Sequence, residues 1–518
     1  MKVVLISMPD VVPAVMHQDV VHMPNHGIAC VGGNIGARHR VFLIDLIRKR
    51  TSLKKYLTKT LTEISPDLVG LSAMTWQYNT CIRIVRLIKS ILPRVRIALG
   101  GYHATLSAEE ISASPEADLI DFLVRGEGEA AFRRLVDALD GQDDPASIPS
   151  LSFKEKNDFI HNERATPCDL SSLKLPLRDE RRLTRGYHLM FSGIECLETS
   201  RGCTRGCNFC SMQHMYGKSY RTYPVLRIMD DLDDIRRRKK TRTIFVVDDN
   251  LVLSPAWVDE ICEAILQKGY RDLRLMVQAD CLSIARNAEM VRKMGRAGFR
   301  AIFLGIENAS AESLAALEKY DVTTVSRQAV DICHRSGIMV LGGAIFGLPD
   351  DDEDAIRRNY VFLNTIGVDA VYCQILTPYP QTRLREQLLE EGLVTNRGDF
   401  SKYNGFWANV RTRHLSAEQL QYFFWYYRQN ALGWWTPSAF IGSQGAVWTA
   451  LWQYLVKPVM QFFFNRKVSR AGWQALHEEA LENLQRMNAF SDLQTYSTGA
   501  AGGASPESAG KTKRDGRL

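Results

Sequence analysis

The sequence predicts an α/β protein with two parallel β-sheets and a helical C-terminal region. Short apolar runs alternate with amphipathic segments over most of the 518 residues, which is the pattern of parallel strands buried on both faces and joined by helices. This alternation is interrupted once by a stretch containing Asp, Pro and Ser, and it gives way near the end to helical periodicity rich in aromatic residues. A chain of this length is expected to hold two or three domains.

The first series of apolar runs predicts a doubly wound parallel sheet over residues 1–140. Its strands are expected at KVVLIS, RVFLIDL, PDLVGLS, RVRIALGG and LIDFLVRGEGE. Glycines follow several of these runs, and open α/β sheets bind ligands in the crevice outside the carboxyl ends of their strands. The first domain is therefore expected to bind a nucleotide-like or tetrapyrrole ligand.

A second series begins at residue 194. It follows a region over 141–193 with the composition of a linker, in which LSF and FIHNE can pair as a hairpin. Six further strands are expected at IECLETS, TIFVVDD, LRLMVQA, AIFLGIE, MVLGGAIFG and AVYCQIL. Six such units predict a partial (β/α)6 barrel over residues 194–382, with its site at the C-terminal rim of the strands.

Residues 383–495 are expected to form helices, and residues 496–518 a disordered tail, because the tail is rich in Gly, Ala and Ser. Lys457 and Pro458 interrupt the longest aromatic run, which leaves no apolar stretch of the length that crosses a bilayer. Aromatic and basic side chains also gather in helices that lie at a membrane surface. Helices that cap the barrel and a peripheral membrane contact therefore both remain open. Candidate pocket walls are Tyr379, Tyr422, Trp425 and Tyr426.

Composition excludes several classes of protein. Apolar residues make up 45% and charged residues 24% of the chain, as in globular proteins. The net charge is only +7, and the densest basic run, residues 236–240, falls where a helix is expected to end, so no nucleic-acid partner is expected. Eleven cysteines at irregular spacing and no cleavable secretory signal predict a reducing cytoplasmic location without a disulfide framework.

Three of the cysteines are regularly spaced. The run TSRGCTRGCNFCSM places Cys203, Cys207 and Cys210 at positions i, i+4 and i+7, in a loop that follows a strand. Three thiolates bind three irons of a four-iron cube and leave the fourth iron without a protein ligand. A chelating substrate can then bind that iron. A zinc site completed by His214 and a set of buried core cysteines are the alternatives.

The CxxxCxxC spacing, with the aromatic Phe209 before the last cysteine, resembles the signature of the radical S-adenosylmethionine (SAM) superfamily. The resemblance covers about residues 194–382. It implies a [4Fe–4S] cluster whose open iron is chelated by the methionyl amine and carboxylate of SAM. One electron, expected from reduced ferredoxin or flavodoxin, then cleaves SAM to a 5′-deoxyadenosyl radical.

Later segments resemble the SAM-binding elements of the same family, in the same order. IFVVDDNL resembles the edge of the second strand, FLGIEN the fourth strand and GGAIFGLP the fifth. The SAM-binding residues that this resemblance implies are Phe209, Asp248, Asp249, Asn250, Glu307, Gly343, Ile345, Gly347 and Pro349. LTPYPQT resembles the turn after the sixth strand, with Gln381 where glycine is more usual. Without a ligand, the two aspartates would cap the helix that follows and the glycines would form tight turns.

The first domain resembles the cobalamin-binding domain of the B12-dependent radical SAM class, through PDLVGLSAMT, IALGGYHAT and VRGEGE. Small residues after these strands let the backbone approach a bulky flat ligand. The implied cobalamin-binding residues are Ser72, Thr75, Gly100, Gly101, His103, Gly126 and Glu127. The pattern Asp-x-His-x-x-Gly, which supplies an axial histidine in other cobalamin proteins, is absent. His103 is the nearest imidazole candidate, and a turn-stabilising role is its alternative.

Together the two resemblances imply a cobalamin-dependent radical SAM methyltransferase that methylates an unactivated carbon. The aromatic C-terminal helices suggest an apolar substrate, such as a polycyclic lipid of the hopanoid type, whose C-2 methylases share this two-domain plan. A peripheral location at the inner face of the membrane would suit such a substrate.

Three other functions are weighed against this one. An oxidative cyclase of a porphyrin-type ring would use the same two domains. A non-catalytic cobalamin or redox sensor would be expected to have lost the SAM-binding elements, which are intact here. A tRNA methylthiotransferase would need a β-rich RNA-binding module, for which the C-terminal sequence gives no indication.

Overall fold

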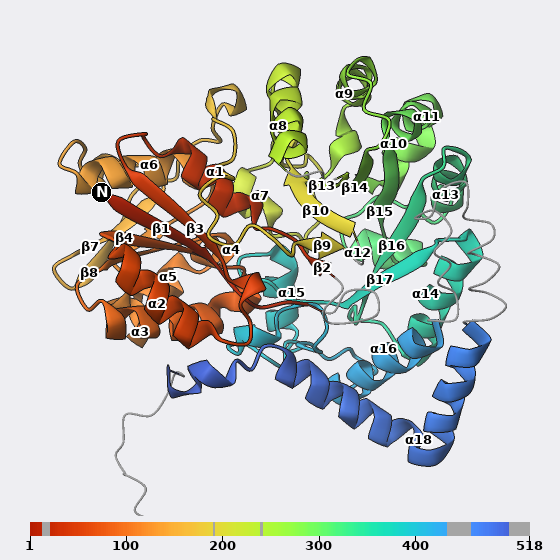
Figure 1. The fold of residues 1–518 in the computed structure, drawn as a ribbon. Coiled ribbons are helices and arrows are strands. Elements are labelled where there is room, and N and C mark those ends of the chain that lie inside the picture. The colour runs from red at the N-terminus through yellow and green to blue at the C-terminus, as the bar shows by residue number, and fades with distance from the viewer. Residues whose placement is uncertain (13–20, 190–191, 239–241, 432–456, 497–518) are drawn as a thin grey trace, which may run out of the picture.

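The computed structural model describes residues 1–12, 21–189, 192–238, 242–431 and 457–496. These residues form two main sheets that lie side by side, each covered by helices, with the C-terminal helices running along one side of both (Figure 1). The predicted α/β fold class, with a doubly wound sheet, a partial barrel and a helical C-terminal region, is confirmed.

The first sheet has the strand order β3-β1-β4-β5-β6-β7-β8. Its first five strands are parallel and coincide with the five predicted runs. They are β1 (Lys2–Ser7), β3 (Arg40–Asp45), β4 (Leu68–Ser72), β5 (Arg96–Gly100) and β6 (Phe122–Val124). The direction of winding reverses between β1 and β4, and sheets of this kind bind ligands outside the carboxyl ends of the strands at such a switch point.

Helices cover both faces of this sheet, which explains why its strands are apolar without alternation. Val3 and Leu5 of β1 are buried in one hydrophobic cluster, and Val4 and Ile6 in another on the opposite face. The helices are α1 (His26–Asn34) and α6 (Gly128–Leu139) on the first face, α2 (Leu53–Ile64) and α3 (Tyr78–Ile91) on the second, and the short α4 (Tyr102–Leu106) and α5 (Ala108–Ser112) after β5.

The expected hairpin within residues 141–193 is present. It consists of β7 (Leu151–Glu155) and β8 (Asp158–His161), which pair antiparallel. Strand β7 also pairs antiparallel with β6. The hairpin is therefore the edge of the first sheet rather than a separate unit.

The second sheet has the strand order β17-β16-β15-β14-β13-β10-β9-β2. Six of these strands are parallel and coincide with the predicted series. They are β10 (Ser192–Leu197), β13 (Thr243–Val246), β14 (Arg274–Asp280), β15 (Phe299–Glu307), β16 (Met339–Phe346) and β17 (Ala370–Ile375). The helices that connect them are α8 (Val225–Arg238), α9 (Pro255–Gln267), α10 (Cys281–Arg286), α11 (Ala288–Ala297), α12 (Ala311–Ala316), α13 (Ser326–Arg335) and α14 (Glu353–Ile366).

A segment of the first domain completes the edge of the barrel. Strand β2 (Val21–His22) pairs antiparallel with β9 (His188–Leu189), and β9 pairs antiparallel with β10. The chain thus leaves the first sheet after β1, joins the second sheet, and returns to begin α1. This crossing places the start of α1 between the two domains.

The C-terminal region packs under the barrel. It contains α15 (Arg383–Glu390), α16 (Ala417–Ala431) and α18 (Lys457–Met487), the last bent at a non-helical Gly472. The candidate pocket walls Tyr422, Trp425 and Tyr426 contact α18, as the ring pair of Tyr426 and Trp473 at 4.7 Å between centroids illustrates. None of the helices described is both long and apolar enough to span a bilayer. Most of the aromatic run before Lys457 and the predicted disordered tail lie outside the described residues.

The end of the described chain returns to the first domain (Figure 1). Leu493, in a short 3-10 helix over Ser491–Tyr496, is fully buried in the same cluster as α2 and α3. The side chain of Asn488 donates a hydrogen bond to the Val11 carbonyl (2.9 Å) and accepts one from the Val11 N–H (3.0 Å). The C-terminal segment therefore fastens the helical region to the sheet domain.

Replacing Leu493 by alanine is expected to lower the free energy of unfolding by roughly 2–5 kcal/mol, the range for leucines removed from packed cores. Chemical denaturation followed by circular dichroism measures this change. Leu226→Ala is the matched control, because Leu226 is 81% exposed and its loss is expected to cost less than about 0.5 kcal/mol. Equal effects of the two substitutions would contradict the docking of the C-terminal segment.

Candidate active site between the two sheets

The three cysteines of the signature lie in one loop, between β11 (Ser200–Arg201) and α7 (Met212–Tyr216). The loop begins at Gly202, which has φ 86°. A Cβ at this position would lie 2.3 Å from the Ser219 carbonyl oxygen. Only glycine fits a left-handed and crowded position of this kind, so Gly202 allows the close turn that precedes Cys203.

Groups that follow several barrel strands hold this cluster loop across the C-terminal rim. Asp249, after β13, accepts a hydrogen bond from the Gly202 N–H (3.0 Å). Asn208 Nδ2 donates to the carbonyl of Ala316 (2.9 Å), after β15, and the Asn208 carbonyl accepts from the Leu384 N–H (3.2 Å), after β17. The cluster loop is therefore fixed where the strands of a barrel place their catalytic groups.

The thiols have surroundings suited to an iron–sulfur cluster. Cys203 Sγ accepts hydrogen bonds from the Arg205 N–H (3.5 Å) and from Asn250 Nδ2 (3.8 Å), and hydrogen bonds to sulfur tune such clusters. Burial raises the pKa of Cys203 and Cys207, and it raises the pKa of Cys210 to about 12. Cluster binding must therefore displace protons from these thiols.

Three cysteines on one loop suit a four-iron cube, whose fourth iron then has no protein ligand. A zinc site completed by His214 would need four donor atoms gathered around one ion. Among the described residues, the group of donors that could hold a single metal ion is His26, Cys30 and Glu198, and it includes none of the three cysteines of the loop.

The polar residues after β13 contact the cluster loop and the strand before it. Asp248 is buried, and its carboxylate accepts hydrogen bonds from the Thr199 N–H (2.7 Å), from Thr199 Oγ1 (2.5 Å) and from Ser200 Oγ (2.5 Å). Asp248 thus fixes Thr199 and Ser200, which precede the cluster loop, while Asp249 and Asn250 form hydrogen bonds with the loop itself. Their binding of SAM remains a prediction.

Glu307 ends β15 beside the cluster loop. Its Oε1 accepts a hydrogen bond from Lys319 Nζ (2.8 Å). Although burial opposes it, the Glu307 carboxylate raises the pKa of Lys319, so that this lysine stays charged. Both charges act on the pKa of Cys207, with burial as the main influence. A balanced ion pair therefore lies next to the middle cysteine.

The remaining predicted SAM-binding residues lie at or near the same rim. Gly343 and Ile345 lie on β16, Gly347 and Pro349 follow it, and the half-buried Phe209 packs on the barrel core from the cluster loop. Gln381 has φ 62°, a left-handed conformation in which glycine is favoured. The turn after β17 thus has a glycine-like backbone without the glycine.

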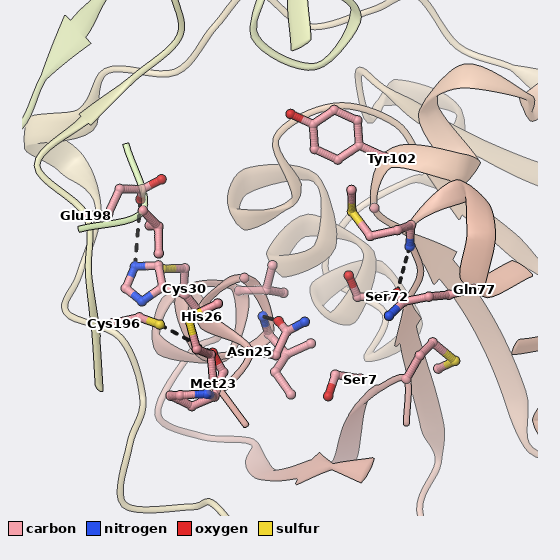
Figure 2. A pocket seen from close by; sticks show the side chains of 18 of the residues that line it. Ser7, Met23, Asn25, His26, Cys30, Ser72, Gln77, Tyr102, Cys196 and Glu198 are labelled. Atoms are coloured by element: carbon pink, nitrogen blue, oxygen red, sulfur yellow. Dashed lines mark hydrogen bonds and ion pairs between the residues drawn. The ribbon is translucent and has the colours of Figure 1, made fainter. Parts of the chain in front are cut away.

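One cavity of about 880 Å³ extends from the carboxyl edge of the first sheet into the barrel. Figure 2 shows Ser72 and Tyr102 of the first domain on one side of it, and Cys196 and Glu198 of the barrel on the other. The side chains that line it from inside the barrel include Phe245, Met276, Gln278, Phe303, Leu341 and Tyr372. The interior wall is mainly apolar, and both domains contribute to one space.

Five of the seven predicted cobalamin-binding residues line this cavity. They are Ser72, Gly100, Gly101, Gly126 and Glu127. Gly101 has φ 91°, and a Cβ there would lie 2.8 Å from the Ala73 carbonyl oxygen, so only glycine allows the segments after β4 and β5 to pack this closely. The cavity also reaches Gly70, Ala98 and Phe132, between the sheet and its helices. These features fit a flat cofactor with a tail that enters the first domain.

Thr75 and His103 are not among the residues that line this cavity. The His103 ring is buried between the rings of Tyr78 (4.1 Å between centroids) and Phe400 (4.9 Å). Burial lowers the pKa of His103 to about 3, so the imidazole is neutral. His103 therefore packs between aromatic rings and does not border the cavity, and its predicted role as a cobalamin-binding residue stays a prediction.

Sequence reasoning missed a buried ion network that joins the domains. Arg201, just before the cluster loop, donates to Glu198 (Nε to Oε1, 3.0 Å), to Glu127 (3.1 Å) and to Glu129 (2.5 Å). Arg221 also pairs with Glu127 (3.0 Å). The available signal was the pair of charged residues in CLETSRGC, immediately after an apolar strand. Glu127, predicted to meet cobalamin, is thus largely occupied by two arginines.

A buried acid lies at the other side of the cavity. Asp10, after β1, accepts a hydrogen bond from Thr80 Oγ1 (2.7 Å) with Oδ1. Its Oδ2 has no hydrogen-bond partner among the described residues. Burial, only partly offset by this hydrogen bond, raises the pKa of Asp10 to about 7.

Asp10→Asn is expected to make the stability of the apo-protein less dependent on pH. With a pKa of about 7 in the folded state and about 4 in the unfolded state, Asp10 binds its proton more tightly when folded. Stability therefore falls as pH rises from about 4 to 7, by up to about 4 kcal/mol. Denaturation midpoints at pH 5 and pH 8 test this. An unchanged pH dependence in the variant would contradict the assignment.

Cys203→Ala is expected to reduce bound iron from about four atoms per chain to near zero after anaerobic reconstitution, because a cube with two protein thiolates is poorly held. Iron analysis and the visible absorption of the cluster measure this. Cys262→Ala is the control, because Cys262 is buried in α9 away from the rim. Full iron retention in the Cys203 variant would exclude this cysteine as a ligand.

Comparison with known proteins matches each domain to a family. Residues 14–136 match the B12 binding domain, and residues 197–363 match the Radical SAM superfamily. Two solved structures share the fold across both domains. They are TsrM from Kitasatospora setae (TM-score 0.63, 18% identity, 77% of this chain and 79% of that one) and OxsB (TM-score 0.68, 19% identity, 95% and 76%).

Curated relatives extend over most of the chain. An uncharacterized methyltransferase of Pyrococcus horikoshii is 28% identical, over 77% of this chain and 85% of the relative. The hopanoid C-3 methylase of Methylococcus capsulatus is 31% identical (67% and 65%), and the anaerobic magnesium-protoporphyrin IX monomethyl ester cyclase of Cereibacter sphaeroides is 24% identical (73% and 61%). The chain thus spans less than two thirds of these last two proteins. The two matched domains and their order, together with these relatives, show that this protein is a cobalamin-dependent radical SAM enzyme, whose cofactors are a [4Fe–4S] cluster, SAM and cobalamin.

Proposed function

We propose that the protein transfers a methyl group from methylcobalamin to an unactivated carbon of an apolar, polycyclic lipid. The observation that carries this proposal is the continuous cavity between the two domains. It joins the carboxyl edge of the first sheet, where five of the predicted cobalamin residues line it, to an apolar barrel interior. Asp249, which fixes the cluster loop through the Gly202 N–H, also lines it, whereas the three cysteines do not. A substrate in this space would lie between the two cofactor sites.

Separate groups of residues would hold the cofactors and shield the substrate. When bound, the cluster and SAM supply a hydrogen-abstracting radical, and cobalamin supplies the methyl group. Cys203, Cys207 and Cys210 hold the cluster at the rim, and Asp249 fixes their loop through the Gly202 N–H. The apolar walls of the barrel exclude water, which protects a carbon radical from side reactions.

The choice of a lipid rests on the character of the cavity wall and on one relative. Phe245, Phe303 and Leu341 line the cavity from three strands of the barrel, and apolar walls of this kind select apolar ligands. The hopanoid C-3 methylase is a relative whose name gives a polycyclic lipid as its substrate. Val459 and Phe462 of α18, 53% and 61% exposed, favour a peripheral contact with the membrane that holds such a lipid. Reduced ferredoxin or flavodoxin is the proposed electron donor.

Oxidative ring formation on a porphyrin is the second candidate. It is favoured by the cyclase relative, which is similar over 73% of this chain, and by a cavity large enough for a flat ring. Both reactions begin with hydrogen abstraction, so the arrangement of the cluster loop serves either one. They differ in whether a methyl group appears in the product.

Methyl transfer is tested with SAM that carries a CD3 group. The reconstituted protein, with methylcobalamin and a low-potential reductant, is expected to give a CD3-labelled product from hopanoid or other polycyclic lipid extracts, detected by mass spectrometry. Cys203→Ala is the control and is expected to give no product. A product from lipid or magnesium porphyrin without the label would contradict methyl transfer and favour the cyclase. Labelling of a polar substrate but no lipid would contradict the substrate class.

A further inference from the structure

His26 lies where the two domains meet. It is the first residue of α1, directly after the segment that crosses to the edge of the barrel. It lines the same cavity as the predicted cobalamin-binding residues (Figure 2). Among the described residues it is therefore an imidazole of the first domain that borders the cofactor space, whereas His103 does not line it.

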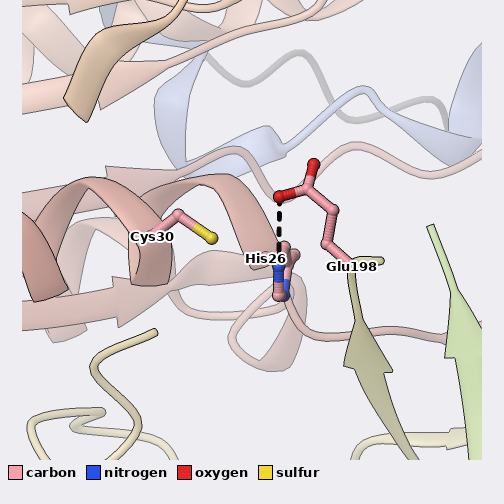
Figure 3. Close-up of side chains that lie close together, drawn as sticks. All are labelled: His26, Cys30 and Glu198. Atoms are coloured by element: carbon pink, nitrogen blue, oxygen red, sulfur yellow. Dashed lines mark ion pairs between the residues drawn. The ribbon is translucent and has the colours of Figure 1, made fainter. Parts of the chain in front are cut away.

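The two ring nitrogens of His26 have different surroundings. Nε2 faces the carboxylate of Glu198, 3.9 Å from its Oε2 (Figure 3). Nδ1 is buried and has no hydrogen-bond partner in the described part of the chain. Histidines that bind metals commonly direct their other ring N–H at a carboxylate, which fixes the tautomer and leaves a free lone pair on the ligating nitrogen. His26 directs Nε2 at the Glu198 carboxylate in the same sense, at an ion-pair distance of 3.9 Å that is longer than a hydrogen bond.

The protonation state of His26 suits metal binding. Its side chain is only 9% exposed. Burial, together with the positive charge of Arg178, holds the pKa of His26 well below its usual range, and Arg201 and Arg181 act in the same direction. The ring is therefore neutral at physiological pH, and a neutral imidazole nitrogen is the form that binds a metal.

A free divalent ion held by His26, Cys30 and Glu198 is the competing possibility, because their ligand atoms lie within 4.8 Å of one another. The carboxylate of Glu198, however, already accepts hydrogen bonds from Arg201 (2.9 Å) and Tyr223 (2.8 Å) at Oε2. Burial also raises the pKa of the Cys30 thiol well above its usual value. A site with three donors would have to break these hydrogen bonds and displace that proton, beside a buried guanidinium.

Cobalt in a corrin ring needs only a single nitrogen from the protein. We propose that His26 Nδ1 supplies an axial ligand to the cobalt of cobalamin. In the segment PNHGIA, His26 is flanked by Pro24 and Ala29 at the positions where the pattern Asp-x-His-x-x-Gly has Asp and Gly. The pattern is therefore altered around a retained histidine. This inference rests on cobalamin binding and not on the proposed methyl transfer.

Isotope labelling tests the proposal in the unmodified protein. The protein is produced with ¹⁵N-histidine, loaded with hydroxocobalamin and reduced to cob(II)alamin, and its electron paramagnetic resonance spectrum is recorded. With unlabelled protein, an axial nitrogen splits each cobalt line into a triplet, which is expected to become a doublet with ¹⁵N-histidine. Absence of nitrogen splitting would overturn the proposal. A triplet that ¹⁵N-histidine does not change would also overturn it, because such a triplet comes from the nitrogen base of the cofactor itself.

Two variants identify the histidine. His26→Ala is expected to abolish the nitrogen splitting, whereas His103→Ala is expected to retain it. The opposite result assigns the ligand to His103 and overturns the proposal.

Cobalt and zinc per chain are measured in the same samples. Zinc lost on His26→Ala with an unchanged cobalamin spectrum would favour the free-ion site, and wild-type protein that takes up no cobalt would contradict the proposal at its premise. Neither readout requires a substrate or methyl transfer.

Discussion

The buried pairing of Arg201 with acids from both domains is the constraint on which the rest of the site depends. Glu127 is the N-cap of α6 in the sheet domain and Glu129 lies in its first turn, Glu198 directly follows β10, the first barrel strand, and all three carboxylates pair with one guanidinium. Removing the partner of buried charges typically costs several kcal/mol, because the others remain without compensation. Two residues later the chain reaches Cys203, so the same interaction that docks the domains also fixes where the cluster loop begins.

This docking turns two open sheets into one enclosed space. Each sheet alone would present its carboxyl edge to water, which is where open α/β sheets and barrels bind their ligands. Set edge to edge, they share a cavity whose barrel side is apolar. His26 of the sheet domain and Glu198 of the barrel meet at the interface between the two domains. Glu198 in turn pairs with Arg201, which lies two residues before Cys203.

The sequence predicted the fold and the cluster loop because both depend on local patterns. Continuous apolar runs such as KVVLIS identify strands buried on both faces, and the spacing of Cys203, Cys207 and Cys210 limits the metals they can hold. The ion network and His26 were not predicted, because they depend on which surfaces two separate domains bring together. Gln381 illustrates a different limit, since its backbone angle is one that the residue type does not indicate. The position of the β7–β8 hairpin at the edge of the first sheet likewise depends on the pairing of β7 with β6.

The hydrogen bonds between Asn488 and Val11 join points near the two ends of the chain. The sheet domain contacts the barrel, the barrel contacts the helical region, and the helical region contacts the sheet domain again. Two domains joined by one hinge can move apart to admit a large molecule. Here the hydrogen bonds between Asn488 and Val11 would also have to break. Val11 itself borders the cavity. The docked C-terminal segment therefore holds both the domain arrangement and part of the cavity wall in place.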